Sequence, residues 1–550
     1  MRKCKVVLAL CLLVASISPA GSQVVVKDIN WRILRLENFD VYHYDDSMPV
    51  MGAVSEFIID AKKRATFLAT DIDYKIPFFL YSSQNDFKQS LIARIGEGTG
   101  GVTEVYKNRL LVGHRGSMRE LNRVIAHEYV HEVQFAVLFG GWWRSAQLAK
   151  FIFYPLWLME GLAEYASGDL DAVEREMYVR DATLNKRNLR IMQLYNFSHL
   201  EPHEVTLAYK TSELLMRFIA EEYGEEKLRE LLVTFKDAFD SNSVFLSVIG
   251  ADVATLDFKF SEFLQERYGE YSEKKIPEGV KLTKRNTRYA VFNVTPVLWQ
   301  NNLFYISDER GRNEVWVRDT VSGRAKVLVG LKDNREIDYI SMEGRALAMS
   351  PDGSRLVFIA GKNNRDFLCV YDIDSGTIEK ISPQINHSSL ATPFFYPCGK
   401  KIIFSAMVHS IRNLYVHHIE ENKTETLTSD FYDNVDPVVS PDGDFVVYAS
   451  ERQKDGFWDY DLFIHNTRTN AARQLTSFEW DERTPSFSPD GRKVVFAAAP
   501  DAIRNVYEYD LEEGTIRKIT DVPGGVFTPS YSGDEVVFSL FQAGRKDIFK

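Results

Sequence analysis

The chain has 550 residues and a formal net charge of −11, and this length is enough for two or three globular domains. Hydrophobic residues make up 45% of the chain and charged residues 26%, a composition that excludes a disordered protein and a polytopic membrane protein. The negative charge and the lack of long basic runs argue against nucleic acid as a partner, because phosphate affinity depends on clustered Lys and Arg.

The first twenty residues have the pattern of a secretory signal peptide. Arg2, Lys3 and Lys5 precede an apolar stretch from Val6 to Ile17, and small residues follow as far as Ala20. We expect cleavage after Ala20 and export to a periplasmic or extracellular location. The alternative is a membrane-retained N-terminus, but the apolar stretch is short for a bilayer span. No transmembrane segment is therefore expected after cleavage.

Four cysteines occur in the chain, and two of them, Cys4 and Cys11, lie in the predicted signal peptide. The mature protein would keep Cys369 and Cys398, which are too few for a disulfide scaffold. They form either a single bridge or two unpaired core or turn cysteines, and we favour the unpaired interpretation.

The region after the signal peptide mixes strand and helix patterns. Strand-like runs at Phe39–Tyr44 and Ile76–Tyr81 flank a helical pattern from Val50 to Thr70. The glycine-rich run Gly96–Gly101 predicts a turn, and another strand-like run follows at Arg109–Val112. Long helical patterns dominate the rest of the N-terminal half, so we predict an α+β domain.

A predicted helix in this domain carries the motif HEYVH, residues 127–131. It starts at the capping-box pattern Ser117–Glu120 and continues with apolar residues at helical spacing. Residues four apart project from one face, so the imidazoles of His127 and His131 can bind one metal ion. Glu128, about 100° further round the helix, would lie beside the ion, where it can take a proton from water.

A third ligand must come from another segment, because two histidines leave a tetrahedral site incomplete. Glu160 in the helical pattern WLMEGLAEY, residues 157–165, is the natural choice. We therefore predict one Zn²⁺ ion held by His127, His131 and Glu160. Glu164, one turn after Glu160, is either an acceptor for the N–H of a ligating imidazole or a partly solvated carboxylate, and we favour the first interpretation.

With HEYVH upstream of WLMEGLAEY, the sequence resembles the gluzincin peptidases, the group that contains thermolysin and aminopeptidase N. The resemblance covers roughly Asn38 to Tyr268. It implies a zinc metallopeptidase domain in which a glutamate on a later helix is the third ligand. The gap between His131 and Glu160 is longer than in aminopeptidase N, which puts the shape of the loop in doubt but not the ligands.

Peptide hydrolysis also needs a hydrogen-bond donor near the developing oxyanion, and gluzincins commonly use a Tyr or His from a later helix. Tyr209, at the predicted start of a helix that runs to Gly224, is our candidate, and a packing role is the alternative. His199 and His203 are rivals, although Pro202 between them argues against a helical ligand pair.

The segment between the two motifs, from Phe135 to Leu158, is rich in aromatic residues. It could line a substrate cleft or touch a membrane surface, but we favour a buried insertion. Arg144 and Lys150 interrupt the segment, which argues against a transmembrane helix.

After residue 285 the helical patterns end and a repeat begins. Its turns lie at residues 350–353, 396–399, 440–443, 488–491 and 530–533, and the steps between their glycines are 46, 44, 48 and 42 residues. Three turns read Ser-Pro-Asp-Gly, and each turn precedes an apolar β run. Repeats of this length with several short strands predict propeller blades. A weaker copy around Leu303–Ile306 brings the number of blades to six.

The last repeat ends at Lys550 without the final strand that its predecessor has at Gly514–Thr520. The segment Gly279–Thr283 resembles that strand and could pair with the last blade, which would close the ring and remove its open edges. The alternative is a chain that is truncated or that continues in its natural form.

These repeats resemble the TolB-type propeller, whose blades have the same Ser-Pro-Asp-Gly turn. We predict a signal peptide at 1–20, a gluzincin-like domain at 21–272 and a TolB-like propeller at 273–550, with the boundary in a charged stretch at 270–280. The resemblances imply an exported zinc metallopeptidase with Glu128 as general base, whose propeller binds a peptide or protein substrate or an envelope protein partner. The alternative is a non-catalytic envelope scaffold protein with an idle peptidase-like domain.

Overall fold

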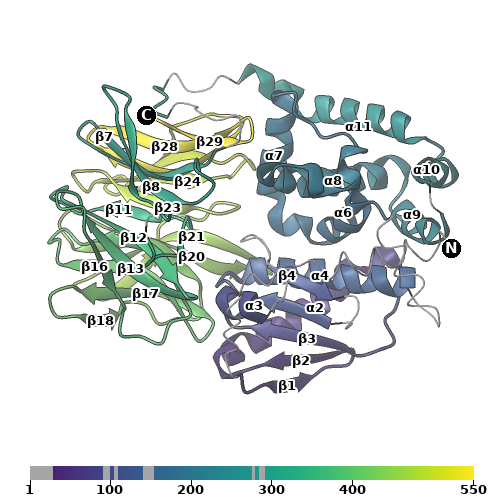
Figure 1. Ribbon diagram of the computed structural model, residues 1–550, viewed down its shortest axis with the longest axis horizontal. Coiled ribbons are helices and arrows are strands. Elements are labelled where there is room, and N and C mark those ends of the chain that lie inside the picture. Colours follow the sequence, from purple (N-terminus) through teal and green to yellow (C-terminus); the bar gives the residue numbers. More distant parts are fainter. Residues whose placement is uncertain are drawn as a thin grey trace, which may run out of the picture.

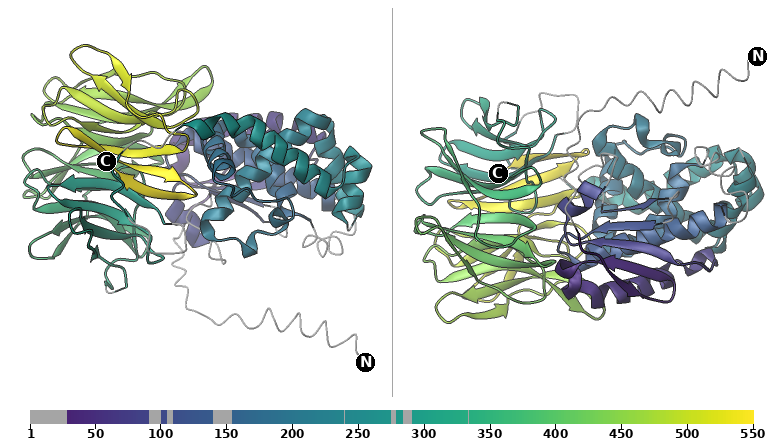
Figure 2. Two further views of the ribbon diagram at one scale, coloured as in Figure 1. Left: turned by 90° about the horizontal axis from the view of Figure 1, so that it is seen from above. Right: turned by 60° about the horizontal axis from the view of Figure 1, so that its bottom comes forward.

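The computed structural model describes residues 29–90, 100–104, 109–139, 154–238, 240–274, 279–283, 291–332 and 334–550. The predicted signal peptide lies outside the described residues, as does most of the aromatic-rich segment. An α+β domain with many helices packs beside an all-β propeller (Figures 1 and 2). The predicted two-part fold class is therefore confirmed.

The α+β domain begins with a five-stranded sheet in the order β1-β2-β3-β5-β4. Both edge pairs are antiparallel and both inner pairs are parallel. Helices α2 and α4 share one hydrophobic core with the inner strands. The elements of this part are β1 Arg32–Arg35, β2 Phe39–His43, η1 Asp45–Val50, α2 Met51–Arg64, η2 Thr66–Leu68, β3 Ile76–Tyr81, α3 Gln84–Ser90, β4 Gly101–Glu104, β5 Arg109–Gly113 and α4 Met118–Phe139.

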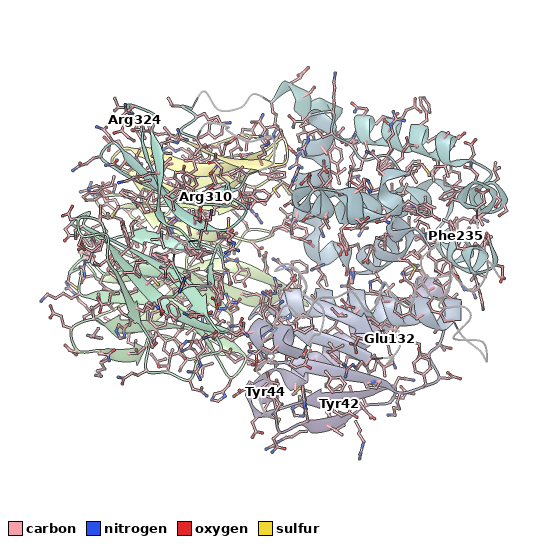
Figure 3. The ribbon with its side chains drawn as sticks, viewed as in Figure 1. Tyr42, Tyr44, Glu132, Phe235, Arg310 and Arg324 are labelled. Carbon is pink, nitrogen blue, oxygen red and sulfur yellow. The ribbon has the colours of Figure 1, made fainter. Side chains whose placement is uncertain are left out.

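A helical part follows and packs over the other end of the same core. In the side-chain view, Glu132 of α4 lies above Tyr42 of β2 and above Tyr44, which follows that strand, and Phe235 of α9 lies above Glu132 (Figure 3). The elements of this part are α6 Leu156–Ser167, η4 Gly168–Asp171, α7 Ala172–Leu184, η5 Gln193–Tyr195, η6 Phe197–His199, α8 Pro202–Tyr223, α9 Glu226–Asp237, α10 Ser241–Ile249, α11 Val253–Tyr268 and η7 Gly269–Glu273.

Helix α8 differs from its prediction, because it begins at Pro202 and not near Tyr209. Proline suits the first helical turn, where its missing N–H is not needed. Glu201 and Glu204 form a capping box around that start. Tyr209 therefore lies two turns inside the helix, and Pro202 separates His199 in η6 from His203 in α8, as predicted.

The propeller consists of six antiparallel sheets, so the predicted six blades are confirmed. Their strands are β6 Asn293–Trp299, β7 Asn302–Ser307, β8 Glu314–Asp319 and β9 Ala325–Val329; β10 Tyr339–Ile340, β11 Leu347–Met349, β12 Arg355–Lys362, β13 Arg365–Asp372 and β14 Ile378–Ile381; β15 Ser389–Phe395, β16 Lys401–Val408, β17 Ile411–His418 and β18 Lys423–Thr426; β19 Asn434–Val439, β20 Phe445–Lys454, β21 Phe457–Asn466 and β22 Ala471–Gln474; β23 Arg483–Phe487, β24 Lys493–Ala498, β25 Asn505–Asp510 and β26 Ile516–Lys518; β27 Gly525–Ser532, β28 Glu535–Gln542 and β29 Arg545–Phe549.

The Ser-Pro-Asp-Gly motif forms the turn that leads into the second long strand of a blade. In the turn before β12, the Ser350 hydroxyl donates to Asp352 at 2.6 Å, and the Gly353 N–H donates to the Ser350 carbonyl at 2.9 Å. Gly353 has φ +74°, a left-handed conformation that glycine adopts without steric cost. This geometry explains why the repeat requires glycine at that position.

Residues 280–282 run antiparallel to β29 in the last blade. Val280 and Lys550 exchange two backbone hydrogen bonds of 3.0 Å, and the Leu282 N–H donates to the Ile548 carbonyl at 2.8 Å. The structure thus places the segment around Gly279–Thr283 where a fourth strand of this blade would lie.

Two further predictions concern the cysteines and the membrane. Cys369 is buried in β13, Cys398 is exposed, and neither forms a disulfide bond. Within the described part of the chain, no helix has the length and apolar character needed to cross a membrane.

Candidate metal centre

Helices α4 and α6 bring His127, His131 and Glu160 together. The two Nε2 atoms are 3.2 Å apart, and each lies 3.4 Å from Oε2 of Glu160. Among the described residues this is the only group of His, Cys, Asp and Glu side chains found close enough to hold a metal ion. The three residues are half-buried, so the group remains accessible from solvent.

The spacing of these three atoms fits a zinc ion. Ligands at 2.0 to 2.1 Å from a tetrahedral ion lie about 3.3 to 3.4 Å from one another, which matches the observed triangle. The electrostatics also favour a cation: burial alone would lower the pKa of His127, but the carboxylates of Glu160 and Glu164 outweigh it and raise that pKa to about 10.

The second nitrogen of each imidazole has a neighbour that orients the ring. Nδ1 of His127 lies 3.1 Å from Oε1 of Glu164, the contact expected from the sequence. Nδ1 of His131 lies 2.9 Å from Oε1 of Gln134, whose amide donates to the Met159 carbonyl at 2.8 Å. Such contacts hold metal ligands in place. Gln134 was missed, although its place three residues after His131 on one helix is a usable signal.

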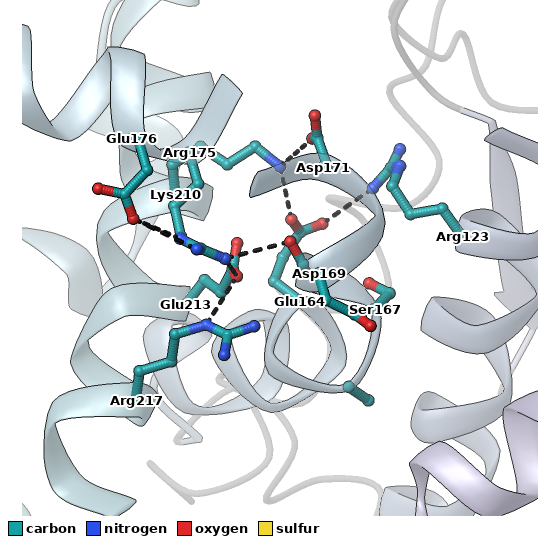
Figure 4. Close-up of polar contacts among 12 residues, drawn as sticks. Arg123, Glu164, Ser167, Asp169, Asp171, Arg175, Glu176, Lys210, Glu213 and Arg217 are labelled. Carbon is teal, nitrogen blue, oxygen red and sulfur yellow. Dashed lines mark hydrogen bonds and ion pairs between the residues drawn. The ribbon is translucent and has the colours of Figure 1, made fainter. Parts of the chain in front are cut away.

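A buried ion-pair network surrounds Glu164 (Figure 4). The Lys210 ammonium donates to Glu164 at 2.7 Å and to Asp171 at 2.6 Å, and Arg123 donates to Glu164 at 3.3 Å. Burial would raise the pKa of Glu164, but Lys210, His127 and Arg123 outweigh it and hold that pKa well below its usual range. Glu164 is therefore a carboxylate that is ready to accept a hydrogen bond from an imidazole.

Glu128 lies between the metal group and strand β4. Its side chain accepts a hydrogen bond of 2.6 Å from Thr103, and the residue is only 6% exposed. A Cβ atom on Gly101 would come within 2.7 Å of Glu128, so glycine is needed for the strand to approach the helix. Thr103 was not predicted, and its signal is its position just after the glycine-rich run.

Tyr209 faces the same carboxylates from α8. Its ring packs edge-to-face on Phe197, with 5.4 Å between the centroids. Burial raises the pKa of Tyr209, and the charges of Glu160, Glu164 and Glu128 raise it further. The two rival histidines are not in the metal group: His199 ends η6, and His203 lies 3.3 Å from Arg187.

The propeller reaches the first turn of α4. Glu451 of β20 is fully buried and accepts hydrogen bonds from the Ser117 hydroxyl and the Met118 N–H, both at 2.6 Å, and from the Arg119 N–H at 3.3 Å. Ser117 in turn accepts from the Glu120 N–H at 3.0 Å, as the capping-box pattern predicts. A propeller side chain therefore completes the cap of the helix that carries HEYVH.

The Arg119 side chain ties the same turn to β21 of the same blade and to the segment that leads into β23 of the next blade. It donates to Asp481 at 2.5 Å, to Asp459 at 3.3 Å and to the Trp458 carbonyl at 3.2 Å. Burial would lower the pKa of Arg119, but these carboxylates keep the guanidinium charged. The start of α4 is thus held by one blade and by the connection from it to the next blade.

The fold and the metal group together define a metallopeptidase-like domain joined to a six-bladed propeller. Residues 62–266 match the model of the Peptidase MA superfamily. No curated protein matches the chain.

Solved structures similar to the chain include several propellers. TolB from Acinetobacter baumannii is 21% identical with a TM-score of 0.38, over 44% of this chain and 57% of that chain. A putative TolB from Agrobacterium tumefaciens is 20% identical with a TM-score of 0.34, over 40% and 74%. The propeller domain of the Trilobed protease from Pyrococcus furiosus is 13% identical with a TM-score of 0.33, over 47% and 80%.

Proposed function

We propose that the chain is an exported zinc metallopeptidase that hydrolyses peptide bonds. The observation that carries the proposal is the triangle of His127, His131 and Glu160, with Glu128 beside it. The match of residues 62–266 to the model of the Peptidase MA superfamily supports the proposal. Export rests on the N-terminal signal pattern.

His127, His131 and Glu160 would hold the zinc ion. When bound, zinc supplies a Lewis acid that polarises the scissile carbonyl and lowers the pKa of a water molecule. Glu128 accepts the proton of the attacking water on its carboxylate and then delivers it to the leaving amine. The hydrogen bond from Thr103 holds that carboxylate in place. The Tyr209 hydroxyl donates a hydrogen bond to the oxyanion.

The test is a metal analysis of the mature protein combined with digestion of a peptide library, read by mass spectrometry. We expect one zinc ion per chain, and a loss of about 10² to 10⁴-fold in cleavage rate for Glu128→Gln with zinc retained. Cleavage unaffected by the substitution would overturn the mechanism. Zinc without cleavage by the wild type would leave the rival function, an envelope scaffold protein with an idle domain.

The role of Tyr209 is tested separately with Tyr209→Phe, which keeps the ring packed on Phe197. We expect kcat to fall about 10² to 10³-fold with KM and zinc content little changed, because a donor to the oxyanion acts in the transition state. A kcat within twofold of the wild type would assign Tyr209 a packing role.

A further inference from the structure

Two cations of the propeller share one aromatic ring in the last two blades. Lys546 of β29 places its ammonium 3.7 Å from the centroid of the Phe527 ring, and the Arg504 guanidinium, just before β25, lies 4.7 Å from the same centroid. A cation over an aromatic face is held without losing its hydrogen-bond donors. Phe527 therefore positions two positively charged groups side by side.

Neither cation has a polar partner. Among the described residues, the side chains of Arg504 and Lys546 form no hydrogen bond and no ion pair, although both residues are half-buried. Arg345, in contrast, donates to three backbone carbonyls at 2.8 to 2.9 Å from deep inside the same propeller. Since buried cations are normally paired, two unpaired neighbours are exceptional.

The facing element is helix α7, which presents Glu174. Its carboxylate attracts both Arg504 and Lys546 but is not within ion-pair distance of either. Burial and the neighbouring Arg504 lower the pKa of Lys546 to about 8, so the attraction of Glu174 does not compensate the two cations. Asp308 also attracts Lys546 and Asp481 attracts Arg504, yet no described carboxylate lies within ion-pair distance of either cation.

This cluster is connected to the metal centre through α7. Asp171 at the start of that helix interacts with Glu174 and is the second acceptor of Lys210. Lys210 also binds Glu164, which lies behind His127. The unpaired cations therefore lie at the domain interface and are linked through α7 to the network behind His127.

We propose that Arg504 and Lys546 form a subsite that binds a carboxylate of the peptide substrate, an inference that rests on the proposed function. A guanidinium binds a carboxylate through two parallel N–H donors, and an adjacent ammonium adds a charge-assisted hydrogen bond. The carboxylate belongs either to the C-terminus of the peptide or to an Asp or Glu side chain.

The experiment measures binding by fluorescence anisotropy, with full-length Glu128→Gln protein as the parent so that bound peptides persist. Three fluorescein-labelled random hexapeptide pools are compared: one with a free C-terminus, one amidated at the C-terminus, and one lacking Asp and Glu. We expect one of the two modified pools to bind about tenfold more weakly than the first. The weaker pool identifies the recognised carboxylate.

Adding Arg504→Gln and Lys546→Met to the parent should weaken binding of the first pool about tenfold, with no further loss for the pool that lacks the recognised carboxylate. The matched control carries Arg517→Gln and Lys518→Met in the edge strand β26, which removes the same charge from the propeller. Zinc content and thermal unfolding check that each variant is folded.

Equal binding of all pools, no measurable binding of any pool, or unchanged binding by the subsite variant would overturn the subsite. Carboxylate-dependent binding without hydrolysis by the wild type would overturn the proposed peptidase and retain the subsite. Hydrolysis by the wild type, together with binding that does not depend on a carboxylate, would overturn the subsite and retain the proposed peptidase. The two failures are therefore distinguishable.

Discussion

The propeller contacts the α+β domain in two places, and the charged side chains are paired in one of them and unpaired in the other. At the start of α4, Glu451 and Arg119 are surrounded by partners, and each has at least three polar contacts across the interface. Beside α7, the side chains of Arg504, Lys546 and Glu174 form no hydrogen bond or ion pair with any residue that the structure describes. Satisfied buried polar groups give an interface one rigid arrangement, whereas unsatisfied ones cost stability and suggest a ligand that completes them.

The unpaired groups beside α7 do not result from loose docking of that helix. Arg180, nearer its C-terminal end, donates to the carbonyls of Pro523 at 2.5 Å and Gly524 at 3.2 Å. Asp181 accepts two backbone N–H bonds of 2.7 Å from the turn between β28 and β29. These contacts hold α7 against the propeller two turns after Glu174. The separation between Glu174 and the two cations is therefore a feature of the docked structure.

The largest effect on stability is expected for Glu451→Ala. It leaves three donors of the first turn of α4 without their acceptor, so we expect the free energy of unfolding to fall by about 2 to 4 kcal/mol. Thermal unfolding measures the loss, and hydrogen exchange at Met118 and Arg119 localises it. The control is Glu425→Ala, an exposed propeller carboxylate. A loss below about 0.5 kcal/mol would mean that the contacts of Glu451 do not stabilise the interface at the start of α4.

The contacts of Glu451 also show where sequence analysis reaches its limit. The grouping of His127, His131 and Glu160 was predictable because the two histidines share a helix face and Glu160 lies in a recognisable second motif. The blades were predictable because a short local turn repeats. Glu451 is more than 330 residues from its partners in α4, and nothing in its local strand pattern marks it as a helix cap.

The same limit applies to Lys210 and to the subsite cations. A lysine within an amphipathic helix is normally solvated, so its burial between Glu164 and Asp171 depends on how α6 and α8 cross. Gly161 permits that crossing, because a Cβ there would lie 2.8 Å from the Ser212 carbonyl. Such interhelical distances come from tertiary packing, which residue periodicity does not encode.

The second prediction uses pH to test whether Glu451 is as constrained as its contacts suggest. Burial and the charge of Asp433 raise its pKa to about 7, above the value of about 4.3 in an unfolded chain. The folded protein therefore holds a proton that the unfolded chain releases, and stability falls as pH rises from about 4.5 to 7.

Glu451→Gln removes this titration but keeps a side-chain acceptor. Relative to the variant, we expect the wild type to lose between about 1 and 3 kcal/mol over that pH range. Other carboxylates titrate in both proteins and cancel in the difference. Urea unfolding at several pH values measures it, and parallel pH profiles for the two proteins would contradict the raised pKa.

The third prediction concerns Lys210, which binds both Glu164, behind His127, and Asp171, at the start of α7. In Lys210→Met, Glu164 and Asp171 lose their shared cation, so Glu164 no longer has a fixed position behind His127. We expect zinc affinity to fall about 10 to 100-fold, measured by competition with a chromophoric chelator. Lys227→Met, which removes a more exposed ion pair with Glu230, is the control. Unchanged zinc affinity would separate the network from the metal centre.

The smallest effect on stability is expected for Lys546→Met, which removes one of the two unpaired cations beside α7. Removing this ammonium relieves its desolvation and its repulsion by Arg504, while the contact with Phe527 is partly kept by the thioether. We expect the free energy of unfolding to change by less than about 0.5 kcal/mol or to rise. A loss above about 1.5 kcal/mol in thermal unfolding would mean that Lys546 supports the fold, as Glu451 does. In that case the positive charge beside α7 would need a structural explanation, not a ligand.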